Sequence, residues 1–215
     1  MCGRFYVDEE VWREIYRIAE ASGKGQSLQK HAGLGTGGRR DMFPSSQAMV
    51  IRGVQKRAEV QNMKWGYEIP GLKKLLINAR SETVREKRLF GQDFACRRCL
   101  IPAKGFYEWK RSGSGSGKTK YRFHDGSGIL YLAGIYRMSE QGEEFTILTR
   151  AAEGCMEGIH SRMPLLIDAG SIDAWLFAEG EAEKLLHASL PGLERERAEE
   201  EGKEQDGGYE QLSLF

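Results

Sequence analysis

The stretch 129–149, which reads ILYLAGIYRMSEQGEEFTILT, contains two apolar runs separated by a polar turn. The runs, 129–136 and 145–149, have the length of strands and are rich in β-branched and aromatic residues. The connection between them is too short for the crossover that parallel neighbours need. The stretch therefore predicts two antiparallel β-strands.

Much of the remaining chain repeats this pattern of short strands bounded by turn residues. Further strands are predicted at 49–52, 58–63, 75–78, 99–103 and 121–124. So many antiparallel strands do not fit one flat sheet. The expected fold class is therefore α+β, with a curled, barrel-like, mainly antiparallel β-sheet core and peripheral helices.

A helix is predicted near the N-terminus, because apolar residues from Val11 to Ala19 recur at helical spacing after Asp8. Other helices are predicted at 81–90, 171–177 and 180–189. Glycine-rich segments at 23–39 and 112–117 predict a long loop and a hairpin tip that carries no catalytic side chains.

Composition favours a compact intracellular protein. The chain has 215 residues, which fits one domain with appendages. It lacks the ~20-residue apolar run of a membrane span, and charged residues interrupt its first segment, so we expect a cytoplasmic, nucleoid-associated monomer. Cys96-Arg97-Arg98-Cys99 has metal-ligand spacing, but no second pair completes a site. Neither a metal nor a cofactor is expected.

The charge is distributed unevenly along the chain. Residues 194–210 contain eight acidic and three basic residues, a net charge of −5, whereas the whole chain carries +1. The remainder is therefore basic, as is typical of nucleic-acid binders. The predicted organisation is a domain over 1–193 and an acidic flexible tail over 194–215.

Cys2 is the first candidate site residue. Removal of Met1 would leave it with an α-amine and a thiol on neighbouring atoms. Such groups titrate near ~7.7–8.0 and ~8.5, so a useful fraction of each is nucleophilic at neutral pH. The amine condenses with an aldehyde to a Schiff base, and the thiol then closes a thiazolidine ring. The alternative for a lone cysteine is a buried structural residue.

Further motifs follow Cys2 along the chain. They are MCGRF at 1–5, the step Trp65-Gly66, Asn78 in INARSET at 77–83, Glu108 in GFYEW at 105–109, and His160 in GIHSRMP at 158–164. In order and spacing they resemble the SRAP family, the SOS-response-associated peptidases, from residue 2 to about residue 177. The chain departs from the family at Asp41-Met42-Phe43-Pro44, where many members carry Asn-x-Ala-Pro.

The resemblance implies the SRAP fold and a protein that binds single-stranded DNA and crosslinks covalently to abasic sites through Cys2. An abasic sugar is mostly a closed hemiacetal, so acid–base groups must help to open it. Glu108, among aromatic residues, is expected to shuttle protons. His160 is expected to donate to the sugar oxygen, since an imidazole titrates near ~6.5. Asn78 is expected to hold the amine and the ring.

DNA contacts are expected next to these motifs. The candidate phosphate contacts are Arg4, Arg80 and Arg162, because guanidinium groups match phosphate oxygens. The candidate base-stacking rings are Trp65, Phe106 and Trp109. Core packing is the alternative interpretation for each of these rings.

Two other functions remain open at this stage. The first is a thiol peptidase that uses Cys2 with His160 or Glu108. The second is a non-catalytic adaptor that binds single-stranded DNA. Lyase activity and autoproteolytic removal of Met1 are further activities consistent with the same residues.

The extreme C-terminus, QLSLF at 211–215, resembles the short peptide by which bacterial repair proteins bind the replicative sliding clamp. Gln211 would fix the register of this peptide. The apolar side chains that would enter the clamp's hydrophobic pocket are Leu212, Leu214 and Phe215. Packing of this segment back onto the domain is the alternative.

Overall fold

The computed structural model of the chain describes residues 2–23, 38–71, 74–111, 117–126, 128–188 and 192–199. Its strands are β1 (Phe5–Val7), β2 (Arg40–Met42), β3 (Gln47–Val54), β4 (Arg57–Trp65), β5 (Asn78–Arg80), β6 (Arg98–Ala103), β7 (Gly105–Arg111), β8 (Lys118–His124), β9 (Leu130–Ser139), β10 (Gly142–Ala151), β11 (Arg162–Pro164), β12 (Leu166–Ile167) and β13 (Glu194–Arg197). Its helices are α1 (Glu9–Ala21), α3 (Gly91–Cys96), α4 (Ile172–Phe177) and α5 (Glu179–Leu185), with 3-10 turns η1 (Gly154–Met156) and η2 (Ala169–Ser171).

Strands β10, β4, β3, β6 and β9 pair in that order, and β9 pairs back to β10, so they form a closed barrel. Only the β4–β10 pair of this ring is parallel. The two runs of 129–149 form β9 and β10, with Phe145 opposite Tyr136. The predicted barrel-like, mainly antiparallel fold with peripheral helices is confirmed.

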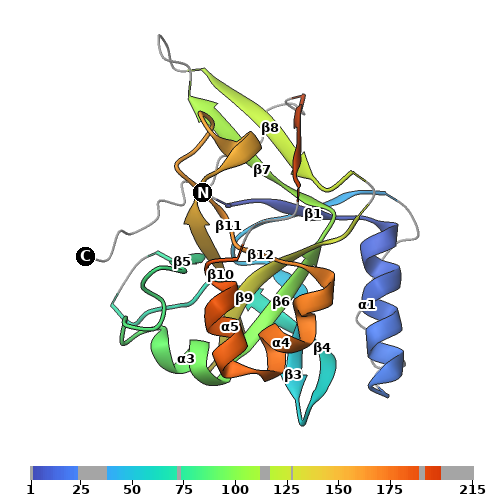
Figure 1. The fold of residues 1–215 in the computed structure, drawn as a ribbon, viewed down its shortest axis with the longest axis vertical. Helices are drawn as coiled ribbons and strands as arrows, with labels where there is room; N and C mark the ends of the chain where they lie inside the picture. The colour runs from blue at the N-terminus through green and yellow to red at the C-terminus, as the bar shows by residue number, and fades with distance from the viewer. Residues whose placement is uncertain are drawn as a thin grey trace.

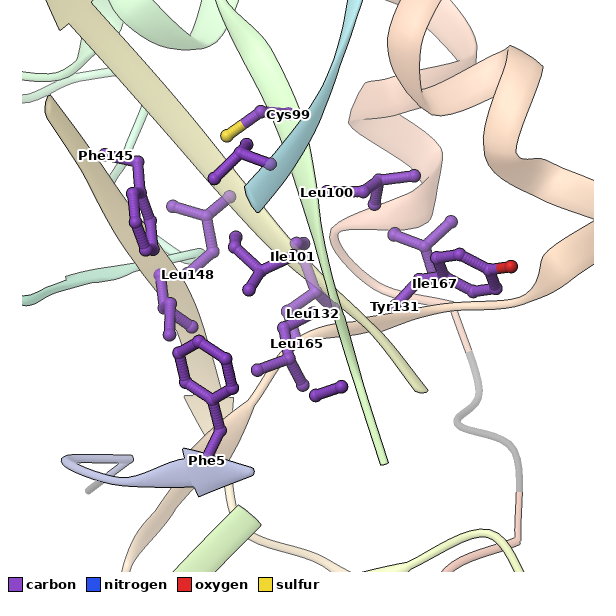
Figure 2. Close-up of a cluster of buried hydrophobic side chains, with 14 of the residues drawn as sticks. Phe5, Cys99, Leu100, Ile101, Tyr131, Leu132, Phe145, Leu148, Leu165 and Ile167 are labelled. Atoms are coloured by element: carbon purple, nitrogen blue, oxygen red, sulfur yellow. The ribbon is translucent and has the colours of Figure 1, made fainter. Parts of the chain in front are cut away.

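Apolar side chains fill the interior of the barrel. Ile101 of β6 lies directly opposite Leu132 of β9, and Figure 2 shows both in one cluster with Phe145 of β10, whereas Leu100 points to the other face of β6. All four side chains are fully buried. Burial of a side chain of this size contributes about 1.5–3 kcal/mol. The barrel therefore forms the main hydrophobic core of the protein.

A second, antiparallel sheet has the strand order β13-β8-β7-β1-β2. Figure 1 shows it at one end of the molecule, with the β3–β4 hairpin at the other end. In this sheet Phe5 of β1 lies opposite Phe106 of β7 and opposite Met42 of β2. The sheet therefore holds the N-terminal segment by pairing on both sides of β1.

The second half of β10 has different neighbours from the first half. There β5 pairs with it in parallel, with Asn78 at Ile147, and β11 pairs antiparallel, with Arg162 at Ala151. These short strands bring Asn78 and the segment that follows His160 to the side of the barrel near the N-terminal segment (Figure 1). We call this junction of the barrel and the second sheet, where Cys2, Asn78, Glu108 and His160 lie, the seam.

Most predicted elements are present. Helix α1 begins after Asp8, whose side chain accepts hydrogen bonds from the backbone N–H groups of Glu10 and Val11, both at 3.1 Å. The strands predicted at 49–52, 58–63, 99–103 and 121–124 lie within β3, β4, β6 and β8, and the predicted terminal helices correspond to α4 and α5. The strand predicted at 75–78 overlaps β5 only at Asn78.

The helix predicted at 81–90 is wrong, because this segment consists of turns before α3. Its bonds include i to i−3 contacts, such as that from the Phe90 N–H to the Lys87 carbonyl at 2.9 Å. The buried side chains Val84 and Phe90 are six positions apart. On an α-helix they would lie about 120° apart around the axis and could not share one buried face.

The boundary of the predicted tail also needs correction. Glu194–Arg197, assigned to the tail from composition, forms β13 and pairs with β8. The C-terminal peptide and most of the predicted loop at 23–39 and tip at 112–117 lie outside the described residues. None of the described helices is long and apolar enough to cross a membrane.

Candidate active site

Cys2 lies just before β1 and is completely buried. Its Sγ is 4.0 Å from the carbonyl oxygen of Arg4. Burial, and after it the charge of Glu108, raises the pKa of the Cys2 thiol. The expectation that a useful fraction of this thiol is ionised at neutral pH is therefore wrong for this arrangement, and the thiol carries its proton.

Asn78 holds the backbone of Cys2. Its side chain is buried at the start of β5, and its Nδ2 donates a hydrogen bond to the Cys2 carbonyl oxygen at 3.1 Å. Within the described residues its Oδ1 is buried and accepts no hydrogen bond. A buried amide oxygen costs free energy until it is paired, so Oδ1 favours a donor that enters the site.

Glu108 lies in the middle of β7 and is 3% exposed. The backbone N–H of the preceding Tyr107 donates to the Arg4 carbonyl at 2.9 Å, which places Glu108 beside the start of the chain. Its charge raises the pKa of the Cys2 thiol and opposes the fall in the pKa of His160. The charge of the Glu108 carboxyl group therefore influences the pKa of both Cys2 and His160.

His160 lies between η1 and β11 and is half-buried. Its Nδ1 is 2.9 Å from the Arg162 backbone N–H and 3.2 Å from the Arg162 carbonyl oxygen. The shorter contact makes Nδ1 the acceptor, so the neutral ring carries its proton on Nε2. Burial lowers the pKa of His160, which keeps the imidazole neutral near pH 7.

The structure thus brings together the four residues that the motifs single out. They come from four separate segments of the chain and meet at the seam. The group combines a nucleophile, a carboxyl that can accept a proton, an imidazole that can donate one, and an amide that orients the nucleophile. Such a set suits acid–base chemistry at a carbonyl carbon.

Arg4 is buried beside this group and is held on several sides. Its guanidinium carbon is 4.4 Å from the ring centre of Phe43 and 5.2 Å from that of Trp109. Its NH1 lies 3.7 Å from a carboxylate oxygen of Asp41. Phe43 is 41% exposed. The segment 41–44, which departs from the common family pattern, therefore supplies a partner for Arg4 and an exposed ring.

The two other predicted phosphate contacts differ from each other. Arg80 is exposed at the end of β5, two positions after Asn78 and hence on the same side of the strand. Arg162 forms a bidentate ion pair with Glu82, at 2.5 and 2.7 Å, and its side chain is 15% exposed. Arg80 is therefore exposed to solvent, whereas the charge of Arg162 is largely neutralised by Glu82.

Trp65 and Phe106 are completely buried. The Trp65 ring N–H donates to the Ile77 carbonyl at 3.0 Å, and the Phe106 ring stacks on Phe123 with centroids 5.2 Å apart. Core packing, the alternative interpretation, describes both rings, and neither offers a face to a DNA base. Trp109 is partly exposed.

Sequence reasoning missed several residues around the site. They are Asp41 and Phe43 at Arg4, Glu82 at Arg162, and Tyr121, which lies opposite Glu108 on β8. Among these residues, only those of segment 41–44 were marked in the sequence, by their departure from the common family pattern. The other contacts depend on pairing between strands, which a single sequence does not reveal. No group of three or more metal-binding side chains is present in the described ranges, where Cys96 is exposed and Cys99 buried.

Comparisons with known proteins identify the family of the chain. The model of the SOS response associated peptidase (SRAP) family matches residues 1–200. The abasic site processing protein YoaM of Bacillus subtilis is 31% identical over 205 residues, which cover 88% of this chain and 85% of that protein. The abasic site processing protein YedK of Escherichia coli is 29% identical over 148 residues, which cover 66% of each chain.

The fold has solved counterparts as well. The crystal structure of a phage-related protein from Bordetella bronchiseptica matches with a TM-score of 0.70 at 26% identity, over 92% of this chain and 94% of that one. The family match spans both the barrel and the second sheet, including every residue of the seam described above. On this evidence the chain belongs to the SRAP family.

Proposed function

We propose that this protein recognises abasic sites in single-stranded DNA and attaches to them covalently through Cys2 once Met1 has been removed. Its relatives are named abasic site processing proteins, which supports a role in processing abasic sites. The observation that carries the proposal is the buried Cys2, oriented by Asn78 at 3.1 Å and under the charge of Glu108. The adduct would shield the lesion during the response to DNA damage.

The first step is the opening of the sugar. The abasic hemiacetal must break its ring bond to release the aldehyde, and the ring oxygen must take up a proton. The Nε2–H of His160 suits this donation, because Nδ1 is occupied by the Arg162 N–H. Glu108 accepts the proton that leaves the anomeric hydroxyl.

The second step is the capture of the aldehyde. The α-amine of Cys2 attacks the carbonyl carbon, and the carbinolamine loses one water to give the Schiff base. The thiol sulfur then adds to the same carbon, and the thiol proton passes through Glu108 to the nitrogen. The net reaction joins one aminothiol and one aldehyde into a thiazolidine and releases one water.

A protonated thiol fits this order of steps. The raised pKa of Cys2 keeps the sulfur from competing for the aldehyde before the amine. A thiol peptidase needs the opposite shift, because the thiolate is the nucleophile in such enzymes. The pKa direction therefore favours aldehyde capture over cysteine peptidase chemistry, although self-removal of Met1 and lyase activity remain compatible with the same residues.

DNA is held by groups around the seam. Exposed Arg80 contacts a phosphate next to the abasic nucleotide, and the exposed ring of Phe43 stacks a neighbouring base together with Trp109. The guanidinium of Arg4 packs against both rings. Arg162 acts mainly by positioning His160, because its side chain is paired with Glu82.

The test compares processed protein with protein acetylated selectively on the Cys2 α-amine. Each is mixed with a single-stranded oligonucleotide that carries one abasic site, and a denaturing gel detects the adduct. The proposal expects a band for processed protein and none for acetylated protein. Binding without any band from processed protein would leave a non-catalytic adaptor, and peptidase activity that survives acetylation would favour a thiol peptidase.

We also propose that the peptide at 211–215 binds the replicative sliding clamp, with Gln211 setting its register and Leu212, Leu214 and Phe215 entering an apolar pocket. The proposal rests on sequence alone. Tethering would raise the local concentration of the Cys2 site at replication forks, within the nucleoid. Purified clamp should bind the parent, and deletion of the last five residues should abolish this binding while crosslinking persists. Clamp binding by the truncated protein would contradict this role.

A further inference from the structure

The acidic and the basic side chains of strand β13 lie on opposite faces of the second sheet. The sequence of β13 is Glu194-Arg195-Glu196-Arg197, so acidic and basic side chains alternate and point to opposite faces of the sheet. All four residues are exposed. The strand pairs with β8 along its whole length, with Glu196 opposite Arg122 and Arg197 opposite Tyr121.

Glu196 faces polar side chains of β8. It forms an ion pair with Arg122 and a hydrogen bond with the ring Nε2 of His124 at 2.9 Å. Directly opposed residues in antiparallel strands share one face. The face that holds Glu196 therefore also holds Tyr107 and Arg122 of the neighbouring strands, and it is the face away from Glu108.

The basic side chains share the face of Glu108. Tyr121 lies opposite Glu108 on one side and opposite Arg197 on the other, so the three form one row across β7, β8 and β13. Two strand-to-strand steps separate Glu108 from Arg197, a backbone distance of about 10 Å. The row therefore begins at the seam and ends on an exposed guanidinium.

The two arginines of β13 have different surroundings. Arg195 donates to the Cys155 carbonyl of η1 at 3.2 Å and stacks on Tyr121, with 5.5 Å to the ring centre. This contact fixes β13 against the segment that leads to His160. Arg197 has no hydrogen bond or ion pair from its side chain among the described residues, and it borders a hollow lined also by Lys118, Thr119, Lys120, Ala198 and Glu199.

From this row we infer that Tyr121 and Arg197 form a further contact site for single-stranded DNA, on one side of the abasic nucleotide. Arg197 binds a phosphate and Tyr121 stacks a base, the combination that single-strand binders use. Glu194 and Glu196 are turned to the other face. Glu199 does line the hollow, but Lys118, Lys120 and Arg197 line it as well, so basic side chains outnumber the one carboxylate there. The inference rests on the proposed function, because it extends the DNA track that starts at Cys2.

The experiment measures equilibrium binding of parent, Arg197→Gln and Tyr121→Leu proteins to oligonucleotides without an abasic site, at several salt concentrations. The matched control is Arg57→Gln, which removes one exposed arginine from the β3–β4 hairpin at the other end of the molecule (Figure 1). Tyr121→Leu keeps the apolar bulk of the partly buried ring. Thermal unfolding of each variant checks that the fold is intact.

Arg197→Gln should weaken binding about threefold to tenfold at low salt and flatten the salt slope by about 0.7, the value for one phosphate contact on a single strand. Tyr121→Leu should weaken binding about tenfold with the slope unchanged. Arg57→Gln should match the parent. With an abasic oligonucleotide extended on only one side, just one of the two polarities should show the Arg197→Gln effect.

The outcomes distinguish a failure of this DNA-contact inference from a failure of the proposed function. If the parent binds and crosslinks DNA but Arg197→Gln and Tyr121→Leu behave like Arg57→Gln, this inference is overturned and the proposed function stands. If processed parent neither binds single strands nor crosslinks an abasic site, both fall.

Discussion

The closed barrel and the seam both contain buried side chains, but these side chains are of different kinds. Inside the barrel the buried groups are apolar, as Leu132 and Phe145 illustrate. At the seam Cys2, Asn78 and Glu108 are just as buried. A buried polar group costs about 1–3 kcal/mol when its partner is missing. The barrel therefore supplies the stability that lets the seam hold groups arranged for chemistry.

Cys2→Ala should have the largest effect on crosslinking while leaving the barrel unchanged. The variant keeps the α-amine but lacks the thiol, so the stable thiazolidine should be lost altogether and a weaker Schiff base that borohydride can trap should remain. Heating each adduct before a denaturing gel measures this. An equally heat-resistant adduct from the variant would show that the thiol has no role.

Glu108→Gln should give the next largest effect. It keeps the shape of the side chain but removes the proton shuttle, so the crosslinking rate should fall on the order of 10²–10⁴. Affinity for intact single strands should stay near that of the parent. Time courses at saturating DNA measure the rate, with His160→Ala beside it. Crosslinking rates equal to that of the parent in both variants would show that neither Glu108 nor His160 takes part in the reaction.

Phe145→Ala tests whether the barrel contributes more than the seam to the free energy of unfolding. It opens a cavity in the barrel and should cost about 3–5 kcal/mol of unfolding free energy, whereas Glu108→Gln should cost far less. Denaturant melts of both proteins test this. Equal losses would mean that the seam contributes as much stability as the barrel.

The thiol provides a pH test. The charge of Glu108 helps to raise the pKa of Cys2, so Glu108→Gln should lower that pKa and ionise the thiol at lower pH than in the parent. Alkylation of Cys2 against pH, read by peptide mass spectrometry to exclude exposed Cys96, measures the shift. A midpoint that moves upward would place Glu108 in a different relation to the thiol.

The smallest expected effects concern DNA contacts at the rim of the seam. Arg80→Ala should weaken single-strand binding severalfold and flatten the salt slope by about 0.7. Arg162→Ala should change the slope less, because Glu82 already neutralises that guanidinium. Salt titrations of both variants decide this, and the reverse ranking would contradict the assignment of Arg80 as the freer cation.

The barrel was predictable from sequence because its strands carry long apolar runs, as in 129–136 and 145–149. The second sheet was largely missed, because β1 and β2 have three residues each and β13 is wholly charged. Such strands form through partners that are distant in sequence. Cys2 was found through its chemistry, and Asn78, Glu108 and His160 through a family resemblance. The role of Phe43 emerged from its contact with Arg4, and that of Arg197 from cross-strand geometry.

Covalent capture by Cys2 is tested most directly by the intact mass of the product that processed protein forms with an oligonucleotide carrying one abasic site. We expect a mass equal to protein without Met1 plus DNA minus one water, with fragmentation placing the DNA on Cys2. An adduct located on a lysine, or no adduct at all, would contradict capture by Cys2.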